Sequence, residues 1–210
     1  MYRLHLIPLV GLFILVACNS ARKPSAENFT GAINQYLAKH GEACTSIGRQ
    51  FPIDIPASAQ QSQYGFGPQL AALRRAGLVS ETDTTTVVHG MLDALRGPTP
   101  LQPVKRFQLT ADGQKYFRQV LGTFGQTGGI CYGQKAVGSI LKWGVPVTMG
   151  GYPQIEVTYT YKLVNLAPWA EESEIQQSFP DIAATVKAAS KAKQNIGLRL
   201  TNNVWEVVGR

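Results

Sequence analysis

The chain has 210 residues, 44% of them hydrophobic and 16% charged, with a formal net charge of +7 at pH 7. This length suits one domain or two small ones, and the apolar share can form a packed core, which excludes a largely disordered chain. The positive residues are scattered, so no polybasic arm for nucleic acid can be named, and we interpret the charge as a basic surface on a soluble body.

Residues 1–17 have the pattern of a secretory signal peptide. Arg3 supplies a positive start, and an apolar run of 12 residues follows from Leu6 to Ala17. That run is too short to cross a hydrocarbon core of about 30 Å as a helix, but it has the length of a signal-peptide core. A plain secretory signal and a short buried core helix are the alternatives that this stretch leaves open.

The apolar run ends in Leu15-Val16-Ala17-Cys18, which resembles the lipobox of bacterial lipoproteins. The resemblance implies cleavage before Cys18, a diacylglyceryl group on its thiol and acylation of the new amine. Two or more such chains anchor a protein stably to a membrane. Asn19 stands where an aspartate would favour inner-membrane retention, so the resemblance implies an outer-membrane location. Residues 18–26 are small and polar and are predicted to form a flexible tether.

Residues 27–40 are predicted to form a helix. Apolar side chains recur on one helical face between Phe29 and Leu37. Ser25 is the expected cap at the start of this helix, and Gly41 is expected to end it.

The region 27–122 is predicted to be mainly helical. After the first helix we expect, in chain order, a short helix in residues 67–79, strands at 84–88 and 104–109, and a capped helix at 110–117. This order, with the motifs LRRAGLV and FQLTADGQKYF, resembles the end of a winged-helix module over residues 67–118. The resemblance implies a scaffold for packing or protein contact and no nucleic-acid partner, because an exported lipoprotein meets no chromosome.

Residues 129–210 are predicted to form an antiparallel sheet with one or two helices, which assigns the chain to the α+β class. The boundary is expected near residues 122–129, where Gln126–Gly129 indicates a flexible break. The clearest strand is 154–164, whose apolar and polar residues alternate, so one face is expected to be wet. Helices at 171–179 and 182–192, the second capped by Asp181, and a terminal hairpin that turns at Asn202-Asn203 are expected to follow.

Cys44 and Cys131 remain if Cys18 carries lipid, and an even pair in an exported protein predicts a disulfide. The two positions lie 87 residues apart, so the bond would contribute about 4 kcal/mol in the chain-entropy model. Two buried free thiols or one reactive thiol are the alternatives. His40 and His89 are the histidines outside the signal, and neither lies in a recognised cysteine-hydrolase motif.

No HExxH, CxxC or GxSxG motif occurs, and no glycine-rich phosphate loop follows a strand. We therefore predict no cofactor, no metal site and no enzymatic activity. Glu171, Glu172 and Glu174 beside Trp169 could serve glycan chemistry, but the solvated first turn of a helix is the favoured interpretation.

The second half of the chain contains many aromatic residues, which we expect to fill the core between sheet and helix. An aromatic sheet face that grips a peptide or glycan is the alternative, and the loop Val145–Pro153 would then form its rim. The residues concerned are Tyr132, Trp143, Tyr152, Tyr159, Tyr161, Trp169 and Trp205.

Three functions follow from these patterns. The leading hypothesis is a non-enzymatic, lipid-anchored protein of the cell envelope that binds a protein partner or supports envelope structure. The second is a module that binds peptidoglycan, another glycan or a peptide through the aromatic face. The third is a hydrolase that uses Cys44 or Cys131 together with His40 or His89.

Overall fold

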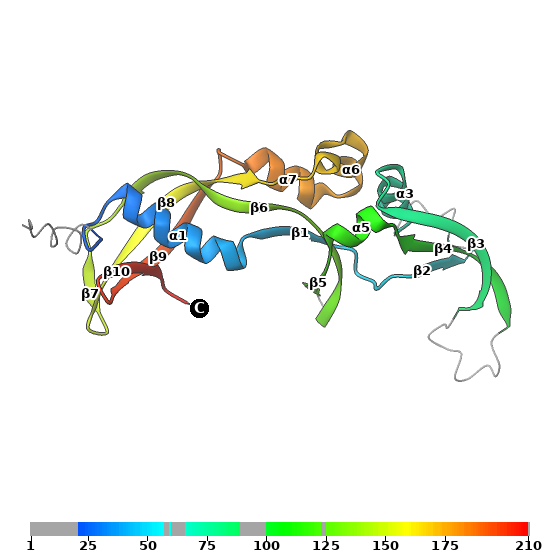
Figure 1. Cartoon of the computed structure of the whole chain (residues 1–210), viewed down its shortest axis with the longest axis horizontal. Coiled ribbons are helices and arrows are strands. Elements are labelled where there is room, and N and C mark those ends of the chain that lie inside the picture. The colour runs from blue at the N-terminus through cyan, green and yellow to red at the C-terminus, as the bar shows by residue number, and fades with distance from the viewer. Residues whose placement is uncertain (1–20, 57–58, 60–65, 89–99, 123–124, 210) are drawn as a thin grey trace, which may run out of the picture.

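The computed structural model of the protein describes residues 21–56, 59, 66–88, 100–122 and 125–209. It is an elongated molecule with two antiparallel sheets and helices packed against them, in agreement with the expected α+β class (Figure 1). In chain order the elements are α1 (Ala26–His40), β1 (Glu42–Ser46), β2 (Ile53–Pro56), α3 (Phe66–Arg75), β3 (Val79–Val87), β4 (Leu101–Leu109), α5 (Ala111–Tyr116), β5 (Phe117–Gly122), β6 (Gly125–Trp143), β7 (Val147–Met149), β8 (Tyr152–Val164), η2 (Pro168–Glu171), α6 (Ser173–Ser178), α7 (Pro180–Ala188), β9 (Lys193–Thr201) and β10 (Val204–Val207).

The larger sheet, here called the half-barrel sheet, has the strand order β1-β6-β8-β9-β10, with β5 paired to β6 and β7 paired to β8. Its strand pairs are antiparallel. β6 has 19 residues and pairs with β5 near its start, β1 in its middle and β8 toward its end. The second sheet, here called the small sheet, has the order β2-β4-β3.

The helix α1 forms where the spacing of apolar residues predicted it. The Ser25 hydroxyl accepts a hydrogen bond from the Asn28 amide, and the Gly41 amide donates to the Leu37 carbonyl, so both ends are capped as expected. The face that carries Phe29 and Leu37 is buried against β6 and β10. This confirms the helix and assigns it to the half-barrel sheet.

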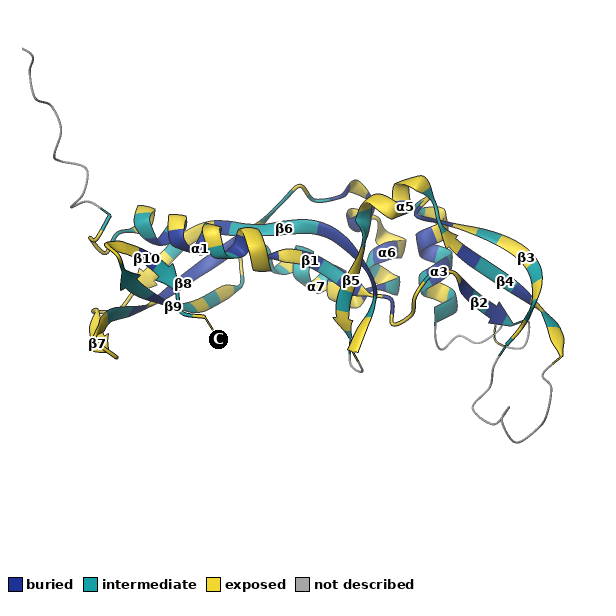
Figure 2. Cartoon of the chain, turned by 60° about the horizontal axis from the view of Figure 1, so that its bottom comes forward, coloured by how far each residue is buried: buried dark blue, intermediate teal, exposed yellow. Residues whose placement is uncertain are grey.

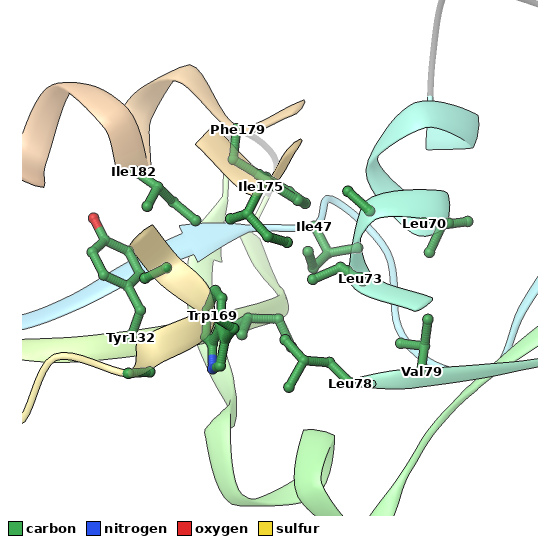
Figure 3. Packing of buried hydrophobic residues seen from close by; sticks show 14 of the residues in the cluster. Ile47, Leu70, Leu73, Leu78, Val79, Tyr132, Trp169, Ile175, Phe179 and Ile182 are labelled. Atoms are coloured by element: carbon green, nitrogen blue, oxygen red, sulfur yellow. The ribbon is translucent and has the colours of Figure 1, made fainter. Parts of the chain in front are cut away.

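Two hydrophobic cores lie along the molecule, and both include residues of β6. The α1 core, between α1 and the half-barrel sheet, consists of Phe29, Ala32, Ile33, Leu37, Val137, Ile155, Val157, Tyr159, Tyr161, Leu198 and Trp205. The junction core, where the half-barrel sheet meets the small sheet, consists of Ala43, Ile47, Ile53, Ile55, Leu70, Ala72, Leu73, Leu78, Val79, Phe107, Ile130, Tyr132, Ala167, Trp169, Ala170, Ile175, Phe179 and Ile182 (Figure 3). Because β6 supplies Val137 to one and Ile130 to the other, the two cores are joined by a continuous strand.

The winged-helix part suggested for residues 67–118 is not seen in the described residues. A helix-turn-helix unit needs two helices packed on each other beside the sheet. Here α3 packs against β3 and α6, with Leu70 and Leu73 in the junction core. The apolar face of α1 is covered by the half-barrel sheet and is unavailable for that role. The small sheet with α3 against it is the arrangement that these residues adopt.

The helix α5 nevertheless forms with the cap that its sequence predicted. The Thr110 hydroxyl accepts a hydrogen bond from the Gly113 amide at 3.0 Å and donates to the Gly77 carbonyl at 2.7 Å. Gly113 packs directly on the Leu78 carbonyl, where an added Cβ would overlap the oxygen. The short motif therefore encodes a close contact between α5 and the segment that leads into β3.

The prediction of a flexible break at Gln126–Gly129 is wrong, because these residues lie inside β6 and pair with β5. Gly128 is required there for close approach, since an added Cβ would overlap the carbonyl oxygen of Arg49. The division expected near residues 122–129 falls within the β5–β6 hairpin. The helix α1 and the strand β1, which precede that division, belong to the half-barrel sheet.

The strand β8 confirms the element expected at 154–164, but its polar face is only partly wet. Glu156 is exposed, whereas Thr158 and Thr160 are buried. The strand is flanked by β6 and β9, and the Thr158 hydroxyl donates to the Asn195 side chain of β9 at 2.8 Å. Threonine can be buried at such a position because its hydroxyl finds a partner and its methyl group packs.

The helices α6 and α7 and the β9–β10 hairpin confirm the expected C-terminal elements. Asp181 is not the cap of α7, because the helix begins after Phe179 with Pro180 in its first turn. Asn202 and Asn203 have φ values of 46° and 67°, the left-handed conformation that a tight two-residue hairpin turn requires. The predicted turn is therefore confirmed.

Candidate functional site

Cys44 of β1 and Cys131 of β6 lie opposite each other in the strand ladder and form a disulfide, as the cysteine count predicted. Ile130 and Tyr132, on either side of Cys131, belong to the junction core. While the bond is formed, neither sulfur is a thiolate that could act as a nucleophile or bind a metal. The Glu42 carboxylate beside the two sulfurs therefore has no thiolate partners for a metal ion.

The remaining candidate residues from the N-terminal half are not brought together. His40 stacks on Tyr36 of the same helix, with ring centroids 4.5 Å apart. His89, the proposed lipid acceptor Cys18 and the sorting residue Asn19 lie outside the described residues. The structure thus places no histidine next to a free thiol in the part of the chain that it describes.

The glutamates near Trp169 and the tryptophan itself face different surroundings. Glu171, Glu172 and Glu174 are all exposed, and Glu174 forms an ion pair with Arg75 of α3. Trp169 is buried in the junction core. The carboxylates therefore lie in water, as expected for a solvated first turn, and the indole ring is not available as a platform beside them.

Most aromatic residues of the second half fill the cores, as the alternation in sequence predicted. Those that are buried are Tyr132, Tyr159, Tyr161, Trp169 and Trp205. The Tyr161 hydroxyl donates to the Thr185 carbonyl at 2.8 Å, and burial raises the pKa of this phenol, so it stays neutral. Trp143 and Tyr152 are different, since they are 42% and 47% exposed.

Trp143 and Tyr152 belong to a larger exposed apolar surface, here called the apolar tip. It consists of Leu141, Trp143, Val145, Val147, Met149 and Tyr152, which are exposed by 46, 42, 84, 55, 57 and 47%. These residues lie at the end of β6, between β6 and β7, in β7 and at the start of β8, and Figure 2 shows β7 as exposed at one end of the molecule. Single exposed apolar residues are ordinary, but six in one hairpin region mark an interaction surface.

The backbone of the β7–β8 hairpin makes the apolar tip project. Met149 and Tyr152 pair across the hairpin, so Gly150 and Gly151 form a two-residue loop. Their φ values are 59° and 82°, which favours glycine and matches the twist of the flanking strands. The sequence marked the loop Val145–Pro153 as a ligand rim. It did not reveal that Leu141 and Trp143 at the end of β6 are also exposed. Trp143 pairs with Val157 and lies on the face of the sheet that α1 covers, whereas Val147 and Met149 pair with Gln154 and Tyr152 and lie on the other face.

The N-terminal side of α1 is held at the same end of the molecule. The Trp205 indole donates to the Arg22 carbonyl at 3.2 Å, and the Asn28 side-chain amide donates to the Lys23 carbonyl at 2.9 Å. The Phe29 ring lies edge-on to both Trp143 and Trp205, with centroids 5.4 Å away in each case. Arg22 and Lys23, which the sequence placed in a flexible tether, are therefore held by Trp205 and Asn28. The segment that leads into α1 lies at the same end of the molecule as β7 (Figure 1).

A groove of about 370 Å³ lies where the half-barrel sheet meets the small sheet, and we call it the junction groove. Its walls include the amides Gln50, Gln108 and Gln114 and the rings Phe51 and Phe117. The two rings meet edge-on, with centroids 6.1 Å apart. No spacing in the sequence could have found this groove, because its residues come from three separate segments.

No protein-family model, no curated protein and no solved structure matches the chain. Among the helices of the described residues, none is long and apolar enough to span a membrane. Function is therefore inferred from the features above: the disulfide, the held N-terminal segment, the apolar tip and the junction groove.

Proposed function

We propose that the protein is a non-enzymatic lipoprotein of the bacterial cell envelope, anchored through Cys18, that binds a protein partner with the end of its body opposite the anchor. The observation that carries the proposal is the hydrogen bond between the Trp205 indole and the Arg22 carbonyl. Cys18 lies four residues before Arg22. An extended chain spans at most about 3.5 Å per residue, so a lipid on Cys18 would lie within about 14 Å of this end.

The shape of the body supports this arrangement. The half-barrel sheet and the small sheet lie one after the other along the long axis, with residues 21–25 at one end and the small sheet at the other (Figure 1). An anchor at one end of such a body holds the other end away from the bilayer. The disulfide between Cys44 and Cys131 is in keeping with an exported protein, because such bonds persist in oxidising compartments.

The small sheet offers a surface suited to a protein partner. Within the described residues β3 pairs only with β4, so its other edge carries backbone groups that an extended segment of a partner can pair with. Thr82 of this strand is exposed. The charges on Glu81 and Lys105 form an ion pair with each other, so they do not prevent a neutral segment from approaching.

Intact mass of the protein purified from bacterial membranes tests the anchor. The expected mass is that of residues 18–210 plus acyl chains, and alkylation should add two tags only after reduction of the Cys44–Cys131 bond. A mass that still includes residues 1–17, or a cut that leaves Cys18 without lipid, would overturn the proposal.

Photo-crosslinking tests the partner-binding end. A photoreactive amino acid at Thr82 on β3 should yield an adduct with a second envelope protein. The same amino acid at Gln35, which is exposed on α1 at the anchored half, is the matched control and should yield none. Equal adducts at both positions would contradict the proposal that the partner binds at the small sheet and not at the anchored end.

The junction groove supports a second candidate function, the binding of a peptidoglycan fragment or peptide. The side chains of Gln108 and Gln114 can exchange hydrogen bonds with hydroxyl or amide groups, and Phe51 and Phe117 offer ring surface. The Gln50 amide already exchanges hydrogen bonds with Gln119. The aromatic face of the half-barrel sheet, which the sequence suggested for this role, cannot serve it, because Tyr159 and Tyr161 are buried. Titration of the protein with soluble muropeptides, followed by amide chemical shifts, should perturb the groove residues in the wild type and not in Gln108→Ala.

A further inference from the structure

The apolar tip is exposed, and none of its six residues belongs to either hydrophobic core. Val145, Val147 and Met149 are more than half exposed, by 84, 55 and 57%. A groove of about 350 Å³ is lined by these three side chains together with Gln154, Ile155 and Glu156. In water this arrangement leaves apolar area unburied, so a further contact is needed to remove it.

The position of the apolar tip indicates what covers it. Trp143 packs on Phe29, and Phe29 packs on Trp205, whose indole holds the Arg22 carbonyl. Trp143 and the start of the folded body therefore lie together, at the end of β6 from which the chain continues into β7. With Cys18 four residues before Arg22, any bilayer that holds the lipid lies within reach of the tip.

The charge around the apolar tip fits an anionic lipid surface. The segment Leu141–Tyr152 contains Lys142 and no acidic residue. Arg199 lies over the Tyr152 ring, 5.5 Å from its centroid, and also pairs with Glu206. Arg22 and Lys23, just before α1, are exposed. One acidic residue, Glu156 of β8, is exposed and lines the groove.

The residue types match the layers of a bilayer surface. Tryptophan and tyrosine favour the interface because they combine an apolar ring with a polar group. Aliphatic side chains favour the acyl region, and basic side chains favour anionic head groups. Trp143 and Tyr152 flank Val147 and Met149 along the hairpin in this order. A membrane accounts for aliphatic, aromatic and basic residues at the anchored end, whereas binding of a protein partner does not require that they occur together.

We propose that the apolar tip inserts into the interface of the bilayer that holds the anchor. The protein then contacts the membrane at two points, the acyl chains on Cys18 and the β7–β8 hairpin. A body held at two points has a fixed orientation, with the small sheet directed away from the membrane. This inference rests on the proposed lipid anchor, and the experiment below separates failure of one from failure of the other.

Tryptophan quenching by brominated lipid tests the insertion. The lipidated protein is reconstituted into vesicles of three parts phosphatidylethanolamine to one part phosphatidylglycerol, with bromine near the head-group end of the acyl chains. Trp169 and Trp205 are buried, so quenching should come from Trp143. We expect bromine to reduce tryptophan emission in the wild type, and we expect this loss to disappear in Trp143→Phe.

Paired aspartate substitutions show whether the apolar tip carries the insertion. Val147→Asp with Met149→Asp should abolish quenching while the lipid still holds the protein on the vesicles. Leu101→Asp with Leu121→Asp is the matched control, because these leucines are 68% and 85% exposed in β4 and β5, away from the tip, and quenching should persist. Unchanged thermal unfolding of both variants establishes that the fold is kept.

The outcomes are distinguishable. A lipidated protein, verified by intact mass, whose Trp143 emission is insensitive to bromine overturns the insertion and leaves the proposed function standing. Equal quenching in both aspartate variants also overturns it, as does a dimer crosslinked through the apolar tip with unquenched Trp143. A mass without lipid on Cys18 overturns the proposed function itself.

Discussion

The β7–β8 hairpin at one end of the molecule and the small sheet at the other are both antiparallel, but they expose different chemistry. The first presents Val147 and Met149 to solvent. The second carries ion pairs, including a bidentate one in which both oxygens of Asp54 accept hydrogen bonds from Arg106 at 2.8 Å. A sheet end that stays in water is kept soluble by charge, whereas an aliphatic end needs another contact. This difference supports the proposal that only the β7–β8 end contacts a membrane.

The disulfide tests whether the two ends belong to one cooperative body. In Cys44→Ser with Cys131→Ser we expect a loss of about 4 kcal/mol, because the closed loop no longer restricts the unfolded chain. For a protein of this size that lowers Tm by roughly 8 to 16 °C. Calorimetry should show a single transition in both proteins, since β6 runs through both cores. Two separate transitions would mean that the half-barrel sheet and the small sheet unfold independently.

Alanine substitutions at two helix glycines, Gly113 in α5 and Gly31 in α1, should change the stability in opposite directions. Gly113→Ala in α5 should destabilise the protein by about 2 kcal/mol, because the new Cβ overlaps the Leu78 carbonyl oxygen and α5 must move. Gly31→Ala in α1 has open space around its Cβ and should stabilise by up to about 1 kcal/mol through helix propensity. Urea unfolding of both variants measures the two effects. The same sign in both would contradict the close contact at α5.

The tie between Arg22 and Trp205 is a weaker and local contact. Trp205→Phe removes the indole donor, so we expect a loss of about 1 kcal/mol and faster trypsin cleavage after Arg22. Trp143→Phe is the matched control, because Trp143 is 42% exposed and makes no contact with Arg22 that the structure records. If both variants are cleaved at the wild-type rate, the N-terminal segment is not held by this hydrogen bond.

The Asp54–Arg106 pair gives an effect of similar size at pH 7, and this effect is lost at low pH. The hydrogen bond from Arg106 holds the pKa of the Asp54 carboxyl below its ordinary value. A lowered folded-state pKa means that the stabilisation is present above the ordinary pKa of about 3.9 and is lost as pH falls through the folded value. Asp54→Asn should therefore cost about 1 kcal/mol at pH 7 and nothing at strongly acid pH. Asp112→Asn, in the exposed pair with Lys115, is the control and should change stability little at either pH.

Local signals in the sequence predicted the elements well. The spacing of Phe29 and Leu37 with a cap at Ser25 predicted α1, and the asparagine pair at 202–203 predicted the last turn. These succeed because hydrogen bonds within one helix or one turn depend on neighbouring residues. The disulfide also followed from counting cysteines, since the two that remain if Cys18 carries lipid have one possible bond.

The candidate site was only partly predictable, because exposure depends on what packs elsewhere. The loop Val145–Pro153 was singled out from its turn residues, but as the rim of a ligand site on an aromatic sheet face. That face is filled by α1 and the rest of its core, which no local pattern indicates. The outward position of Trp143 became visible only once Phe29 and Trp205 had taken the interior.

The class of the fold, most of its helices and strands and the cysteine pairing could be predicted from the sequence alone, and so could the still untested lipid anchor. Each of these depends on residues close in the chain or on a count. The tertiary structure decided that α1 serves the half-barrel sheet, that Gly128 marks a close approach in a strand and that the held N-terminus lies beside the apolar tip. These arrangements join residues far apart in the chain, and burial of apolar surface selects among them only when the whole molecule packs.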